Sequence, residues 1–87
     1  MAKDKILIVD DDSAVRWTLA QALRAGGYDP FEAGTAAAGL ATFDAEQPAL
    51  TLLDINLPDE SGLSVLTKIK ARNPEALVIM ITTDVHV

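Results

Sequence analysis

The sequence predicts an α/β fold of three layers, in which helices cover a parallel β-sheet. Four short apolar runs, rich in β-branched residues, alternate with amphipathic segments along the 87 residues. Continuous apolarity over four to six residues is typical of strands buried on both faces of a sheet. Successive runs are separated by a single helical segment, as in parallel strands joined by right-handed crossovers. The expected order is therefore strand and helix in alternation, beginning and ending with a strand.

The first strand is expected over residues 6–9, and it ends at the acidic triplet 10–12. A helix follows, with Ser13 or Asp12 as its N-cap. Its apolar side chains recur at helical spacing: Val15, Leu19, Ala22 and Leu23. We expect this helix to close at Gly26-Gly27, because glycine adopts the left-handed C-terminal conformation at little cost.

The second strand is expected over residues 28–33. Pro30 cannot donate a hydrogen bond to a ladder, so we place this strand at an edge of the sheet. The second helix is predicted over residues 35–45, with its first residue, a threonine, as the N-cap. Leu40 and Phe43 of this helix are expected to point into the core.

The third strand, over residues 50–53, again ends at an acid, Asp54. A loop bounded by Pro58 and Gly62 leads into the third amphipathic helix. This helix is marked by Leu63, Leu66 and Ile69. The last strand, residues 76–81, is the most apolar and is followed by Thr82-Thr83.

The composition excludes several classes of function. A net charge of −6 opposes binding to phosphate backbones, so we expect no direct contact with nucleic acid. There is no cysteine and one histidine, His86, which leaves no thiolate site and no histidine-based triad or multi-histidine metal site. No apolar run approaches the ~20 residues of a membrane span, and the N-terminus does not resemble a signal peptide. The expected location is the cytoplasm.

Carboxylates gather at one edge of the predicted sheet. Ligands of open parallel sheets bind beyond the carboxyl ends of the strands. If the first and third strands are neighbours, Asp10, Asp11 and Asp54 converge there. Like charges ~4 Å apart repel by ~4 kcal/mol at an effective dielectric constant of 20, so the cluster needs a cation or protons. Oxygen-only ligands suit Mg²⁺ or Mn²⁺. The alternative is that Asp11 and Asp12 only cap the first helix.

A cation beside a carboxylate serves either hydrolysis by an activated water or transfer of a phosphoryl group to the carboxylate. The second reading fits better, because no histidine, cysteine or lysine lies near these positions in the sequence to act as an acid or base. The Thr82 hydroxyl is then placed to bond a phosphoryl oxygen, although a threonine after a strand is more commonly a turn residue. The sequence contains no phosphate-binding G-x-x-x-x-G-K-[ST] motif.

Three segments resemble the receiver domain of two-component response regulators: Ile-Leu-Ile-Val-Asp-Asp-Asp-Ser (6–13), Leu-Leu-Asp-Ile-Asn-Leu-Pro-Asp-Glu-Ser-Gly (52–62) and Val-Ile-Met-Ile-Thr (78–82). The resemblance covers essentially the whole chain, and Asp-Asp-Ser-Ala-Val-Arg-Trp (11–17) is closest to transcriptional activators of the nitrogen-regulation type. It implies a flavodoxin-like sheet with strand order 2-1-3-4.

The resemblance also implies a set of roles. Asp54 matches the acceptor of a phosphoryl group from a sensor histidine kinase. Asp11 matches a direct Mg²⁺ ligand, Asp10 an acid that helps to hold the ion, and Asn56 the backbone carbonyl that completes the metal site. Thr82 matches the switch hydroxyl. Such a domain is a phospho-acceptor in transcription regulation and no enzyme beyond self-phosphorylation and autodephosphorylation.

The resembling domains have five strands and five helices, with an active-site lysine on the fifth strand. On this comparison residues 1–87 correspond to a truncated receiver without the fourth helix, fifth strand and fifth helix. The edge at 77–81 is then expected to be exposed, which favours a homodimer or a strand-exchanged oligomer. The alternatives are a non-catalytic interaction fragment and a phosphohydrolase of the haloacid dehalogenase type. The latter uses Asp-x-Asp, whereas this chain has Asn56 at the second position.

Overall fold

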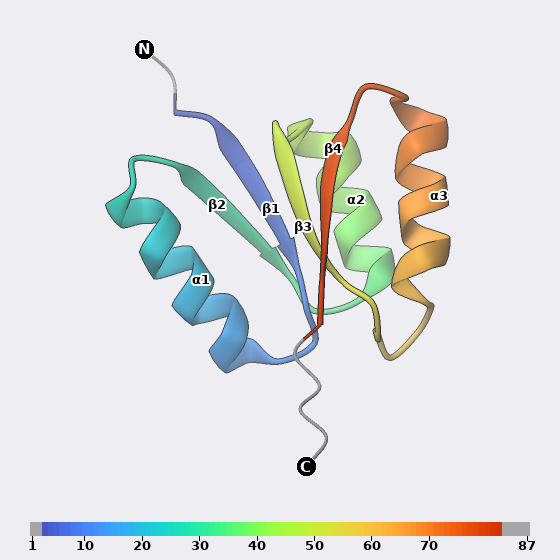
Figure 1. Cartoon of the computed structure of the whole chain (residues 1–87), viewed down its shortest axis with the longest axis horizontal. Helices are drawn as coiled ribbons and strands as arrows, with labels where there is room; N and C mark the ends of the chain where they lie inside the picture. Colours follow the sequence, from blue (N-terminus) through green and yellow to red (C-terminus); the bar gives the residue numbers. More distant parts are fainter. Residues whose placement is uncertain (1–2, 83–87) are drawn as a thin grey trace.

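The computed structural model describes residues 3–82 and contains the predicted layered α/β architecture (Figure 1). The strands are β1 (Lys5–Val9), β2 (Asp29–Ala33), β3 (Leu50–Asp54) and β4 (Leu77–Ile81). The helices are α1 (Ser13–Ala25), α2 (Ala36–Glu46) and α3 (Gly62–Arg72). The sheet is parallel with the order β2-β1-β3-β4, which confirms the predicted order 2-1-3-4. None of the helices within residues 3–82 has the length and apolarity needed to cross a membrane.

β1 lies in the middle of the sheet, and the strands that follow it in the chain are added on its two sides. This arrangement positions the site. β2 pairs with one side of β1 and β3 with the other, so right-handed crossovers place α1 on one face and α2 and α3 on the opposite face (Figure 1). The carboxyl ends of β1 and β3 therefore lie at the switch point where open parallel sheets bind ligands. β2 is an edge strand, as Pro30 predicts.

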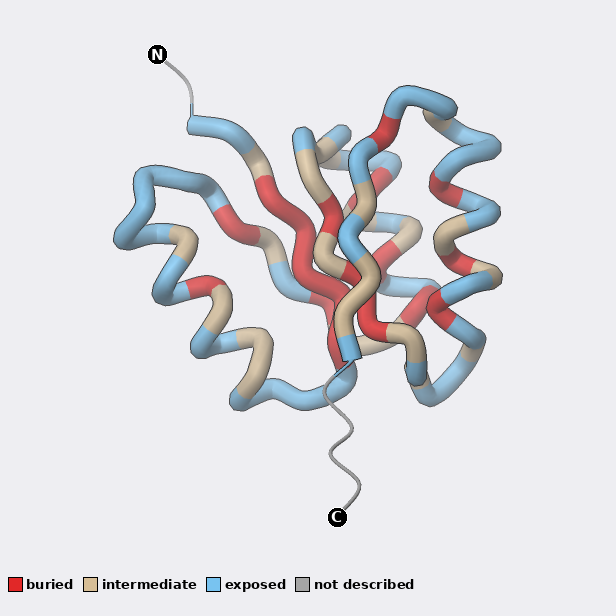
Figure 2. The backbone as a smooth tube through the Cα atoms, viewed as in Figure 1, coloured by how far each residue is buried: buried red, intermediate tan, exposed pale blue. Residues whose placement is uncertain are grey.

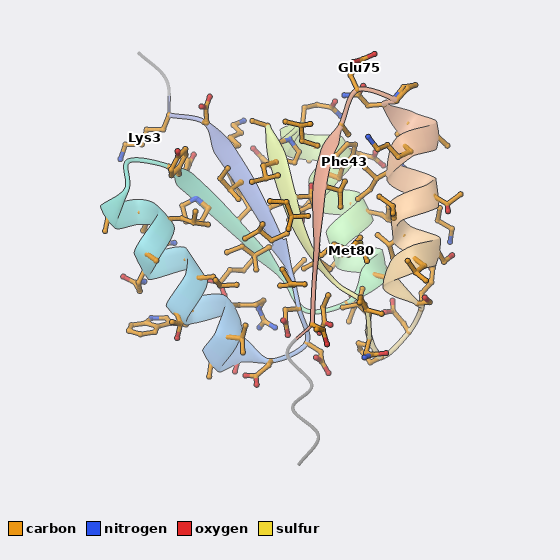
Figure 3. All side chains as sticks on the ribbon, in the orientation of Figure 1. Lys3, Phe43, Glu75 and Met80 are labelled. Atoms are coloured by element: carbon orange, nitrogen blue, oxygen red, sulfur yellow. The ribbon has the colours of Figure 1, made fainter. Side chains whose placement is uncertain are left out.

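The core lies mainly between the sheet and the α2–α3 layer, and β1 is the most deeply buried strand (Figure 2). Phe43 of α2 is among the largest fully buried side chains, and Met80 of β4 packs against the same cluster (Figure 3). Removing apolar side chains from water at ~25 cal/mol per Å² is the main force that holds these layers together.

Two of the predicted helix faces each include one residue that is exposed in the structure. In α3 the sheet-facing residues are Val65 and Ile69, both fully buried, whereas Leu63 is 59% exposed. Leu63 lies two positions before Val65, which corresponds to more than half a helical turn, and so points away from the sheet. In α1 the buried residue is Ala20, and Ala22 is exposed.

The fourth strand carries much exposed apolar surface. β4 pairs with β3 alone among the described residues, and none of its residues is classed as buried. Leu77 and Ile79 are 65% and 51% exposed, as expected for an uncovered edge at 77–81. Trp17 on α1 is also largely exposed.

Candidate functional site

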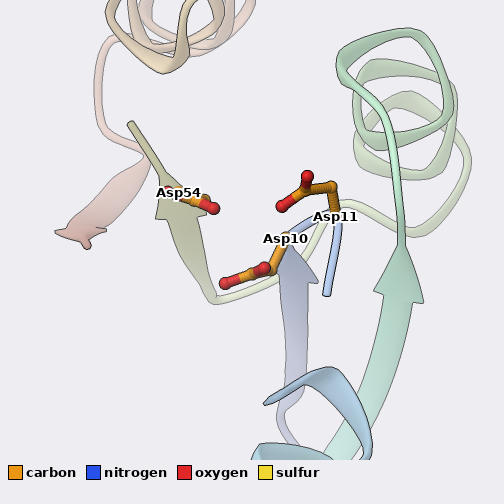
Figure 4. Close-up of side chains that lie close together, drawn as sticks. All are labelled: Asp10, Asp11 and Asp54. Atoms are coloured by element: carbon orange, nitrogen blue, oxygen red, sulfur yellow. The ribbon is translucent and has the colours of Figure 1, made fainter. Parts of the chain in front are cut away.

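Three carboxylates meet where β1 and β3 end. Asp10, Asp11 and Asp54 each offer one oxygen, and these oxygens all lie within 4.8 Å of one another (Figure 4). The register pairs Val9 with Leu53, so that the residues that follow, Asp10 and Asp54, lie side by side. Asp10 and Asp54 are buried and Asp11 is exposed. The predicted convergence of these three side chains is confirmed.

The backbone that follows each strand orients the two buried carboxylates. Asp12 N donates to Asp10 Oδ1 at 2.9 Å, and Asn56 N donates to Asp54 Oδ1 at 3.1 Å. Both are local hydrogen bonds from the residue two positions ahead, the pattern of an Asx turn. Asp10 Oδ2, in contrast, is buried without a hydrogen-bond partner in residues 3–82.

The electrostatics of the cluster disfavour an anionic Asp10. Burial is the largest influence and raises the pKa of Asp10. The Asp12 N–H bond opposes it, and the charges of Asp54, Asp11 and Asp12 raise the pKa further. A cation would offset both causes and would give the unpartnered Oδ2 a ligand. An all-oxygen donor set with a buried, unpaired oxygen fits a hard divalent ion such as Mg²⁺ or Mn²⁺.

The remaining residues of the β1–α1 corner have structural contacts. Asp12 is the N-cap of α1 and accepts hydrogen bonds from Ala14 N and Val15 N, so the capping alternative holds for Asp12 and not for Asp11. Sequence reasoning missed Arg16, whose Nη1 donates to the carbonyl oxygen of Asp10 at 2.6 Å. A basic residue one turn into the helix after an acidic triplet is the only signal the sequence offers for this contact.

A glycine closes the loop after β3. Gly62 N donates to Ile55 O at 2.8 Å, and a Cβ at Gly62 would lie 2.1 Å from the carbonyl oxygen of Asp54. An isolated antiparallel bridge joins Asn56 and Ser61 across this loop. The absence of a side chain at position 62 therefore lets α3 begin directly against the end of β3. The sequence had indicated only a loop boundary here.

Thr82 lies at the same edge of the sheet. Ile81 pairs with Asp54 in the β3–β4 ladder, and Thr82 is the next residue along the chain. It is exposed. Its neighbour Thr83, expected to end the strand with it, lies outside the described residues, as does His86.

Comparisons with known proteins agree with this geometry. Residues 6–87 match the family model described as the response regulator receiver domain. The chain is 39% identical over 82 residues to the DNA-binding transcriptional regulator NtrC of Proteus hauseri, covering 94% of this chain and 17% of that protein. It also spans between 33% and 42% of the length of three other curated regulators.

Two solved structures share the fold. A CheY-like receiver domain protein from Methanospirillum hungatei JF-1 has a TM-score of 0.92 at 38% identity, covering 99% of this chain and 69% of that one. The response regulator TrrA from Thermotoga maritima, solved in complex with Mg²⁺-BeF, has a TM-score of 0.88 at 32% identity, covering 95% of this chain and 72% of that one.

Proposed function

Because the chain belongs to the response regulator receiver domain family, we propose that Asp54 accepts a phosphoryl group from the phosphohistidine of a sensor histidine kinase. The observation that carries this proposal is the cluster of Asp10, Asp11 and Asp54 at the switch point of the sheet. It combines a candidate nucleophile with two further carboxylates suited to a divalent cation.

The transfer needs an oxygen nucleophile and a leaving group. A carboxylate oxygen of Asp54 attacks phosphorus and forms a P–O bond, while the bond from phosphorus to the donor nitrogen breaks. The electron pair stays with the imidazole, which takes up a proton. The Asn56 N–H on Asp54 Oδ1 fixes the orientation of the carboxylate during this step. The product is an acyl phosphate on Asp54, with no turnover beyond autodephosphorylation.

Asp10, Asp11, Asp54 and the backbone carbonyl of Asn56 would hold Mg²⁺ or Mn²⁺. When bound, the ion supplies positive charge against the phosphoryl oxygens. The buried Asp10 Oδ2 and the Mg²⁺-BeF complex of TrrA both support this assignment. Arg16, through its hydrogen bond to the carbonyl oxygen of Asp10, holds the β1 end of the site in position.

Thr82 is the proposed switch residue. Phosphorylation adds about −1.5 to −2 units of charge next to the end of β4, and a hydroxyl there donates to a phosphoryl oxygen. Ile81 pairs with Asp54 across the β3–β4 ladder, and Thr82 is the residue after Ile81, which supports this role.

The test uses a small phosphodonor, so that no kinase has to be identified. The chain is incubated with acetyl phosphate or phosphoramidate and Mg²⁺, and the mass is measured. We expect one added phosphoryl group that depends on Mg²⁺ and is absent from Asp54→Asn. Asp29→Asn, which removes an exposed charge of β2, is the matched control and should react like the wild type. A phosphate mapped to another residue would overturn the role of Asp54.

The exposed edge supports a second function, association through β4. Leu77 and Ile79 are apolar and largely exposed on a strand with one pairing partner in the described part of the chain. Adding a strand to such an edge pairs its free backbone groups and buries these side chains. We infer that a second copy pairs there or exchanges its α3–β4 unit.

A further inference from the structure

We propose that Asp59 is a positioning residue that anchors the phospho-acceptor loop to helix α2 and so holds the metal site in shape. This loop comprises residues 55–61, between β3 and α3. As far as the cation is concerned, the inference rests on the function proposed above. The anchoring itself is a property of the backbone and is testable without a cation.

The contact joins segments far apart in the sequence. Asp59 Oδ1 accepts from Ala36 N at 2.8 Å, and Oδ2 accepts from Ala37 N at 3.0 Å. Both donors belong to the first turn of α2, where backbone N–H groups have no partner within the helix and the helix dipole favours an anion. A carboxylate that accepts two such bonds makes a charge-assisted, bidentate contact. These bonds lower the pKa of Asp59, so it is ionised at neutral pH.

The next helix amide already has its own cap. Ala38 N donates to Thr35 Oγ1 at 3.1 Å, which is the ordinary N-cap of α2. The N-terminus of α2 thus has one partner from its own segment and one from the site loop. Both contacts cap the same helix end, but only the Asp59 contact reaches the loop, and it makes two hydrogen bonds to a carboxylate where Thr35 makes one to a hydroxyl.

Asp59 complements contacts that lie within the loop. The Gly62 N to Ile55 O bond and the bridge between Asn56 and Ser61 fix the shape of the loop, but they do not set its angle to the rest of the molecule. Leu57 packs against the core, and Asp59 adds a directional link to another element.

The helix that receives this link is itself seated on the other half of the site. α2 packs closely on β1, since a Cβ on Gly39 would lie 2.9 Å from a methyl carbon of Val9. Val9 directly precedes Asp10. Asp59 therefore connects the loop whose Asn56 N–H orients Asp54 to the helix that supports the strand carrying Asp10. In this arrangement Asp59 keeps Asp54 and Asp10 at a fixed position relative to each other.

The test compares the two contacts at the end of α2. Mg²⁺ affinity and the rate of phosphorylation by acetyl phosphate are measured for the folded fraction of Asp59→Ala, Asp59→Asn and Thr35→Ala. We expect Asp59→Ala to weaken Mg²⁺ binding about ten-fold, the loss typical of residues that support metal ligands. Asp59→Asn keeps one acceptor oxygen and should lose less. Thr35→Ala removes a cap from the same helix and should bind Mg²⁺ like the wild type. Equal losses in Thr35→Ala and Asp59→Ala, or no loss in the latter, would overturn the positioning role.

Hydrogen exchange separates this inference from the proposed function. Without divalent cations, the amide of Asn56 should exchange faster in Asp59→Ala than in the wild type and remain unchanged in Thr35→Ala. A wild type that fails to bind Mg²⁺ would refute the proposed metal site, while faster exchange in Asp59→Ala would still support the anchor. Unchanged exchange in Asp59→Ala would refute the anchor, whatever the metal result.

Discussion

Replacing Asp10 with asparagine should stabilise the protein at neutral pH in the absence of divalent cations. Asparagine has nearly the same shape, and its Oδ1 can still accept from Asp12 N. The amide nitrogen takes the place of Oδ2, which is buried without a partner in the described chain, and offers donors to the neighbouring carboxylates. The change therefore removes a buried charge and adds possible hydrogen bonds.

The separation of the carboxylates sets the size of the effect. At an effective dielectric constant of 20, two charges at the 4.8 Å limit of the cluster repel by about 3.5 kcal/mol. The repulsion between Asp10 and Asp54 is little screened, because both side chains are buried. The repulsion between Asp10 and the exposed Asp11 is screened by solvent and adds little. After screening and relaxation we expect a gain of about 2 kcal/mol in the free energy of unfolding, or about 10 °C in Tm for a domain of this size.

The pH dependence has a defined sign. The pKa of Asp10 is raised in the folded state, mainly by burial, so its ionisation opposes folding. Below the unfolded-state pKa of Asp10, its carboxyl is neutral in both states and the wild type loses no stability to ionisation. As the pH rises through the raised folded-state pKa, the free energy of unfolding of the wild type falls below that of Asp10→Asn. The gap between the two proteins should therefore be small at acidic pH and largest near neutrality.

The assay is thermal or urea unfolding in EDTA and in Mg²⁺, followed by circular dichroism. Mg²⁺ should stabilise the wild type and affect Asp10→Asn much less, because the ion relieves the same repulsion. Asp29→Asn, with the same change in net charge, should leave stability close to that of the wild type. If Asp10→Asn were no more stable than the wild type in EDTA at neutral pH, the repulsion argument would be wrong.

Two further substitutions test the loop and the edge strand. Gly62→Ala places a Cβ 2.1 Å from the carbonyl oxygen of Asp54 and should cost about 1–3 kcal/mol or more in urea unfolding, together with slower phosphorylation. Gly26→Ala, whose Cβ would meet its nearest atoms at 3.4 Å, is its control, and similar midpoints for both variants would contradict the steric argument. Ile79→Lys should weaken association measured by sedimentation, because it puts a charge on the exposed apolar edge. Ala71→Lys on the exposed part of α3 should not, and a wild type that is monomeric at all concentrations would refute the β4 interface.

Much of the site could be predicted from the sequence because it is built from strand ends. The apolar runs indicate parallel strands, and the carboxyl ends of neighbouring parallel strands lie at one edge of the sheet. Asp10 and Asp54 each follow such a run, so their proximity depends only on β1 and β3 being neighbours. The position before the first helix likewise indicated Ser13 or Asp12 as its N-cap, and in the structure the cap is Asp12.

The exact faces of the helices were less accessible to sequence reasoning. Leu63 and Val65 are both apolar and both close to the start of α3, yet only Val65 is buried. The choice between them depends on the angle at which α3 meets the sheet. Gly62 brings the start of α3 close to the carbonyl oxygen of Asp54, a contact that no local pattern in the sequence indicates.

The sequence by itself determined the fold class from periodicity and the edge position of β2 from Pro30. It also placed the three carboxylates at strand ends, so that their convergence needed only β1 and β3 to be neighbours. Only the tertiary structure decided that Arg16 bonds the carbonyl oxygen of Asp10 and that Asp59 caps a helix 22 and 23 residues earlier in the chain. These contacts depend on where loops and helix ends meet in space. Contacts of this kind follow from the packing of whole layers and cannot be predicted from a local sequence pattern.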